Sequence, residues 1–190
     1  MRIYLNIAIG LLVFVSICSG YSGQAYNTIS VEIAGNRSLG TKRLDRYYEI
    51  EPGGSLKIST PFYIGSLQAN LSMNNNSRTR RSSSGYSSIT ATLEWLFPVK
   101  ILQGVVFQPG IGAGNYLMHF YIREGDNQRE SEICLCGLAG VDVQLSENIF
   151  LSAAWYGRQI STFHKIYLSE LNIGLTYQFQ TPQIMKDILR

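Results

Sequence analysis

The amino-acid sequence predicts an all-β fold: an eight-stranded antiparallel up-and-down transmembrane β-barrel, preceded by a cleavable signal peptide. Three observations predict it. The N-terminus carries an apolar run of signal-peptide length, the last strand alternates strictly between apolar and polar residues, and short connections alternate with longer ones. No other segment has the apolar length of a membrane-spanning helix, so a membrane location would require strands.

The N-terminal residues 1–25 are typical of a secretory signal. Arg2 supplies a basic start, and the apolar run 7–17 is too short to span a bilayer comfortably. Small residues allow cleavage after Gly20 or after Ala25. The chain is therefore expected to be exported.

Composition narrows the class of protein. A formal net charge of +3 is too small to indicate a nucleic-acid binder. Charged residues make up only 15% of the chain, while glycine and tyrosine are abundant, which suits a sheet whose outer face does not meet water. Cys134 and Cys136 are too far apart for an unstrained disulfide and lack further zinc ligands, so we expect two small buried side chains.

The first four predicted strands follow the signal segment, and in each of them apolar and polar residues alternate with a period of two. Their apolar faces carry Ile29, Val31 and Ile33 in 28–35; Leu56 and Ile58 in 46–59; Leu67, Ala69, Leu71 and Met73 in 63–74; and Ile89, Ala91, Leu93, Trp95 and Phe97 in 86–97. The opposite faces are mostly polar, and serine and threonine recur on them.

The last four predicted strands repeat this pattern. Their apolar faces carry Val105, Phe107, Ile111 and Ala113 in 104–122; Leu135, Ala139, Val141, Val143 and Leu145 in 132–145; Ile149, Leu151, Ala153 and Trp155 in 149–161; and Leu171, Ile173, Leu175, Tyr177 and Phe179 in 166–179. Connections after the second, fourth and sixth strands are short, whereas those after the first, third and fifth are longer and polar. An even strand count puts both chain ends on the short-turn side.

The final strand contains the pattern Asn172-x-Gly174-x-x-Tyr177-x-Phe179, which resembles the C-terminal assembly signal of bacterial outer-membrane barrels. Residues 26–180 as a whole resemble the small outer-membrane barrels of the OmpA/OmpX type, with a short tail at 181–190. The resemblance implies a bacterial outer-membrane location, contact with outer-membrane lipid and lipopolysaccharide, handling by the barrel-assembly machinery, and a monomer.

A period of two does not say which face lies inside, so a secreted lipocalin-like barrel with an apolar cavity is an alternative. Two features favour the membrane barrel. Glycine, serine and threonine on the polar face suit a narrow polar interior, and aromatic residues gather near the short turns as an interfacial girdle would: Phe62, Tyr63, Trp95, Phe97, Tyr177 and Phe179.

Charged residues occur on the predicted interior face: Glu32, Lys57, Glu94, Asp142, Arg158 and Glu170. The interior of an eight-stranded barrel is just wide enough to be filled by side chains, and buried charges must be paired. We therefore expect a network in which Lys57 and Arg158 are shared among the carboxylates and hold the barrel closed. A gate in a narrow ion path is the alternative.

Two other groups of residues are candidates for surface contacts. Arg78, Arg80 and Arg81 form a basic loop, which is either solvated or in contact with lipopolysaccharide phosphates. His119 and His164 are expected to be interfacial polar side chains, although some outer-membrane barrels are lipid-modifying enzymes that use a histidine with a serine.

The sequence contains no nucleotide-binding loop, metal cluster or nucleophile motif. It therefore predicts no catalytic residues, cofactor, metal or nucleic-acid partner. The expected role is non-enzymatic, structural or surface-interacting: envelope integrity, adhesion or resistance to host factors.

Overall fold

The computed structural model describes residues 25–39, 48–78, 85–121, 128–162 and 165–182. The predicted signal segment up to residue 24 and the tail from residue 183 onward lie outside this range. Within it, no helix has the length and apolar character needed to cross a membrane.

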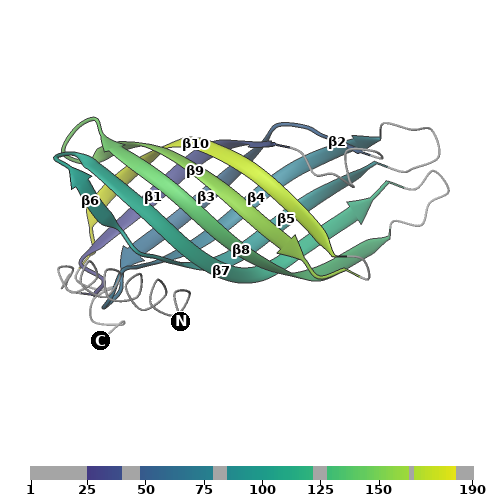
Figure 1. The fold of residues 1–190 in the computed structure, drawn as a ribbon, viewed down its shortest axis with the longest axis horizontal. Helices are drawn as coiled ribbons and strands as arrows, with labels where there is room; N and C mark the ends of the chain where they lie inside the picture. Colours follow the sequence, from purple (N-terminus) through teal and green to yellow (C-terminus); the bar gives the residue numbers. More distant parts are fainter. Residues whose placement is uncertain (1–24, 40–47, 79–84, 122–127, 163–164, 183–190) are drawn as a thin grey trace, which may run out of the picture.

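The described residues form one antiparallel sheet that closes on itself (Figure 1). Its long strands are β1 (Thr28–Ser38), β3 (Gly53–Pro61), β4 (Ser66–Arg78), β5 (Tyr86–Leu96), β7 (Val105–Phe120), β8 (Arg129–Gln144), β9 (Ile149–Ile160) and β10 (Ile166–Gln180). Two short strands, β2 (Tyr48–Ile50) and β6 (Val99–Leu102), are added to this wall. Because β1 pairs with both β10 and β3, and β4 pairs with β5, the predicted eight-stranded up-and-down barrel is confirmed.

Two local departures from the predicted strands lie at the ends of the barrel, and the first has a backbone cause. The predicted strand 46–59 is divided into β2 and β3 at Pro52, which has no N–H group to donate to the ladder. The predicted short turn at Pro98 contains the extra strand β6, which folds back to pair with β7. Both departures lie at the ends of the barrel and leave the strand order of the wall unchanged.

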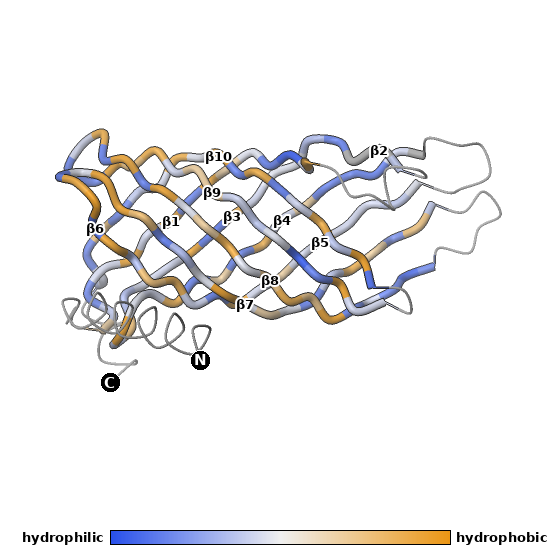
Figure 2. Tube along the Cα trace, in the orientation of Figure 1, coloured by the Kyte–Doolittle hydropathy of each residue, from blue (hydrophilic) through white to orange (hydrophobic). Residues whose placement is uncertain are grey.

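The apolar face of each strand points out of the barrel, and the polar face lines its interior. Large exposed apolar side chains recur along the outer wall, among them Ile33, Ile58, Met73, Leu93, Ile111, Leu135, Leu151 and Ile173. Asparagine, serine, threonine and the predicted interior charges are largely buried. Figure 2 shows this alternation as apolar and polar segments succeeding one another along each strand. The lipocalin-like alternative, with its apolar face turned inward, is therefore wrong.

The aromatic residues near the short turns contact one another. The ring centroids of Phe62 and Tyr63 are 4.8 Å apart, those of Phe62 and Trp95 are 5.9 Å apart, and Tyr177 stacks on Phe179 at 6.2 Å. The turn between β3 and β4 needs Gly65, whose φ of +106° is unfavourable for a residue with a side chain. These aromatic rings form a girdle at the short-turn end, where a membrane interface favours them.

Thr181, the first residue of the predicted tail, belongs to the hydrogen-bonded ladder of the barrel. Its N–H donates to the carbonyl oxygen of Asn27 at 2.9 Å, and its side chain is buried. The ladder between the first and last strands therefore continues one residue beyond Gln180, because Asn27 lies just before β1 and opposite this position.

A charge placed on the outer wall provides a test of the orientation of the two faces. Leu93 is 55% exposed and faces outward, so Leu93→Arg is expected to destabilise the barrel by about 2–4 kcal/mol near the bilayer midplane. Leu175→Arg on β10 is expected to act in the same way. The free energy of unfolding in lipid vesicles measures the effect.

The matched control is the buried Thr92, whose hydroxyl donates to Glu94 Oε1 at 2.6 Å. Thr92→Arg is expected to act by crowding the interior. A spin label at position 93 should be accessible to lipid-soluble quenchers, and shielding of that label would mean that the two faces have been reversed.

Candidate functional site

The lumen of the barrel is the first candidate site, and its short-turn end opens into a polar cavity of about 270 Å³. Glu32, Lys57, Gln108, Asp142 and Thr176 are among the lining residues. Lys57 and Glu32 are cross-strand partners on β3 and β1, and Lys57 Nζ lies 2.7 Å from Glu32 Oε1. Asp142 accepts a hydrogen bond from Gln108 Nε2 at 2.6 Å.

Beyond the cavity, Glu94 is fully buried. Its carboxylate accepts hydrogen bonds from neighbouring side chains: Gln68 Nε2 at 2.6 Å, Asn70 Nδ2 at 3.0 Å, Thr92 Oγ1 at 2.6 Å and Tyr156 Oη at 3.2 Å. Gly112 on the adjacent strand makes room for this group, since a Cβ there would lie 2.6 Å from Glu94 Cγ. Four hydrogen-bond donors compensate for the loss of water around a buried carboxylate.

Arg158 and Glu170 form the second buried ion pair, with Arg158 Nη1 lying 2.5 Å from Glu170 Oε2. Arg158 Nη1 also donates to Ser72 Oγ at 3.3 Å. The ring of Tyr156 lies between the two interior cations, 5.0 Å from the Arg158 guanidinium carbon and 5.2 Å from Lys57 Nζ. Among the described residues, the interior charges are thus held as two separate ion pairs and two hydrogen-bonded carboxylates, Glu94 and Asp142. Tyr156 contacts both cations and Glu94.

Near the long-loop end, the interior contains an apolar cluster that strand alternation did not predict. It consists of Tyr86, Tyr116, Met118, Cys134, Ile160 and Leu168, and the buried Asn76 and Ser88 lie beside it. In the sequence, this cluster could have been predicted from Tyr116 and Met118, because they lie on the same inward face of the strand as Gly110, Gly112 and Gly114. Cys134 and Cys136 are both buried and free, as expected.

The Glu94 cluster, the ion pair at Arg158 and the apolar cluster occupy the lumen beyond the polar cavity, toward the long loops. No group of three metal-binding side chains occurs in the described part of the chain.

The outer rim at the long-loop end is the second candidate site. The sheet register places Ser87 opposite His119, and His119 opposite Arg129, on three adjacent strands. This row could not be predicted from the sequence alone, because it depends on the register in which three strands pair. Arg78 ends β4, whereas Arg80, Arg81 and His164 lie outside the described residues.

A closed eight-stranded wall with an apolar outer face and a polar, filled lumen defines an outer-membrane β-barrel. Solved structures of this class are similar to the chain. Neisserial surface protein A is 16% identical with a TM-score of 0.59, and the match covers 83% of this chain and 100% of that one. The attachment invasion locus protein of Yersinia pestis is 16% identical, with a TM-score of 0.54 and the same coverage.

A major outer membrane protein from Thermus thermophilus is 13% identical with a TM-score of 0.56, and the match again covers 83% of this chain and 100% of that one. No protein-family model matches the chain, and no curated protein sequence matches it significantly. The similarities establish the fold, so the function must be argued from the residues.

Proposed function

We propose that the protein is a non-conducting, non-enzymatic barrel of the bacterial outer membrane with a structural or surface-interacting role in envelope integrity, adhesion or resistance. The observation that carries the proposal is the filled lumen. In the described part of the lumen, Glu94, Arg158 and Glu170 are buried, and a cluster of buried apolar side chains lies toward the long loops. The available surfaces are then the lipid-facing wall and the long-loop rim.

Planar-bilayer recording tests the proposal. The reconstituted barrel is expected to give no discrete channels, because side chains fill an eight-stranded interior. Discrete channels whose conductance changes in Lys57→Ala, at the lumen cavity, but not in Lys165→Ala, at an exposed rim position, would favour the narrow-pore alternative.

The non-enzymatic part of the proposal concerns Ser87 and His119 at the rim. Ser87 and His119 oppose each other, yet among the described residues no hydrogen bond joins them and no carboxylate contacts the imidazole; its ring contact is Tyr121 at 5.6 Å. A serine nucleophile needs a base within hydrogen-bonding reach and a third group that orients the base. Phospholipid hydrolysis that is lost in Ser87→Ala would overturn this part of the proposal.

The surface role itself is tested in cells. Deletion of the gene should lower adherence, survival in serum or resistance to detergent, and the wild-type gene should restore it. One structural neighbour is named for attachment and invasion, which makes adherence the first property to measure. Contact of Arg78, Arg80 and Arg81 with lipopolysaccharide remains a prediction.

A further inference from the structure

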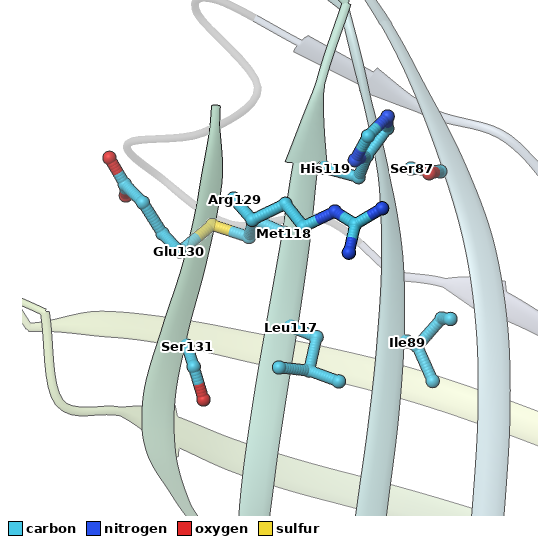
Figure 3. A pocket seen from close by; sticks show the side chains of 8 residues that line it. All are labelled: Ser87, Ile89, Leu117, Met118, His119, Arg129, Glu130 and Ser131. Atoms are coloured by element: carbon cyan, nitrogen blue, oxygen red, sulfur yellow. The ribbon is translucent and has the colours of Figure 1, made fainter. Parts of the chain in front are cut away.

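A groove of about 560 Å³ lies on the outer face of β5, β7 and β8 near their long-loop ends (Figure 3). Two rows of cross-strand partners line it. The first row is Ser87, His119 and Arg129, and the second is Ile89, Leu117 and Ser131. Met118 and Glu130 complete the lining. The first row is polar, and it lies closer to the long loops than the second row, which contains two aliphatic side chains.

Arg129 gives the groove a positive charge. Its side chain is exposed, and Figure 3 shows it extending across the groove with the guanidinium directed toward the strands that carry His119 and Ile89. The neighbouring Glu130 carboxylate points away from this guanidinium in the same view, and its Oε1 accepts a hydrogen bond from Gln128. No ion pair is formed by Arg129 with any described carboxylate.

The second row continues the apolar wall of the barrel. Leu117 is 42% exposed, and on the same face of β7 it is followed toward the short turns by Asn115, Ala113 and Ile111. Most of this path is apolar and lies on the face that we assign to lipid. A ligand that fits both rows therefore needs an anionic group attached to a hydrocarbon chain.

We propose that this groove binds one membrane lipid with an anionic phosphate headgroup, with its phosphate at Arg129 and an acyl chain lying along Leu117 toward the bilayer centre. Arginine presents several N–H donors in a plane that matches phosphate oxygens, and Ser87 and His119 offer further donors beside it. A soluble anion would leave the apolar row unused. This binding site goes beyond the proposed function, since a non-conducting barrel does not require a specific lipid.

Native mass spectrometry of the folded protein, purified from outer membranes into detergent and delipidated, tests the proposal. The probes are dipalmitoyl phosphatidic acid, dipalmitoyl phosphatidylcholine and glycerol 3-phosphate. We expect the first molecule of phosphatidic acid to bind about tenfold more tightly than phosphatidylcholine, as a charge-assisted hydrogen bond would give. Glycerol 3-phosphate, which lacks acyl chains, is expected not to bind measurably.

Variants locate the site. Arg129→Gln should abolish the preference for phosphatidic acid, Arg129→Lys should keep part of it, and Leu117→Ser should weaken binding of the whole lipid. The matched control is Arg37→Gln, which removes an exposed arginine from β1, a strand separated from β8 by β9 and β10, and should leave the preference unchanged. Heat-modifiable migration on gels verifies that each variant is folded.

Three outcomes would overturn the proposal. Equal affinity for the two lipids in the wild-type protein would show that the groove does not select an anionic phosphate over the zwitterionic phosphodiester of phosphatidylcholine. Equal losses in Arg129→Gln and Arg37→Gln would show a general effect of surface charge. Tight binding of glycerol 3-phosphate would show a site for soluble phosphate and not for a lipid.

Discussion

Arg158→Ala is expected to destabilise the barrel by about 3–5 kcal/mol, because it leaves the Glu170 carboxylate buried without its partner. Arg158 is 1% exposed, and its ion pair with Glu170 lies within the filled part of the lumen. The guanidinium also donates a hydrogen bond to Ser72 and lies over the ring of Tyr156, so its removal breaks these contacts as well. The measurement is reversible unfolding by urea in lipid vesicles.

A double-mutant cycle separates pairing from packing. Arg158→Ala combined with Glu170→Ala should cost less than the sum of the two single changes, because the second change removes the unpaired carboxylate. Arg158→Ala combined with a change at Glu94 is also expected to be less than additive, although here Tyr156 lies between the two groups. The control is Arg158→Ala with Glu32→Ala, since Glu32 already pairs with Lys57.

Strict additivity of the Arg158 and Glu170 changes would mean that the ion pair contributes nothing to stability. Equal coupling in the Glu32 control would mean that the coupling reflects the overall charge of the lumen.

The sequence predicted the faces of the strands but not the height of each residue along the barrel. Alternation places Glu32, Lys57 and Arg158 on the inner face, because side chains on a strand point to opposite sides in turn. It does not show that Lys57 opposes Glu32 while Arg158 meets Glu170, since that depends on the register between strands.

The same limit explains what the sequence analysis missed. Met118 and Cys134 were on the inner face by alternation, but only the stagger of β7 and β8 places them together in an apolar cluster near the long loops. The row formed by Ser87, His119 and Arg129 likewise requires the register of three strands. Long-range pairing therefore creates both candidate sites, whereas local periodicity was sufficient for the fold.

Phe179→Ala is expected to remove most of the folded protein from the outer membrane while changing the stability of the refolded barrel only slightly. Phe179 is 36% exposed at the short-turn end and stacks on Tyr177, so the loss of its ring should cost about 1 kcal/mol in vesicles. In cells the effect should be larger, because the last strand resembles the signal that the assembly machinery of outer-membrane barrels recognises through its aromatic spacing.

Truncations supply the matched comparison. Removal of the residues after Pro182 should be tolerated, because it leaves every ladder hydrogen bond described for β10 in place. Truncation after Gln180 additionally removes the hydrogen bond from Thr181 to Asn27, which is worth about 1 kcal/mol, and should lower stability without preventing assembly.

The experiment compares folded protein in outer-membrane fractions with the yield of refolding in vesicles for the three variants. If Phe179→Ala lowers both quantities equally, the ring acts through stability alone. If truncation after Pro182 abolishes assembly while Phe179→Ala does not, the signal lies in the tail and the interpretation of the final strand is wrong.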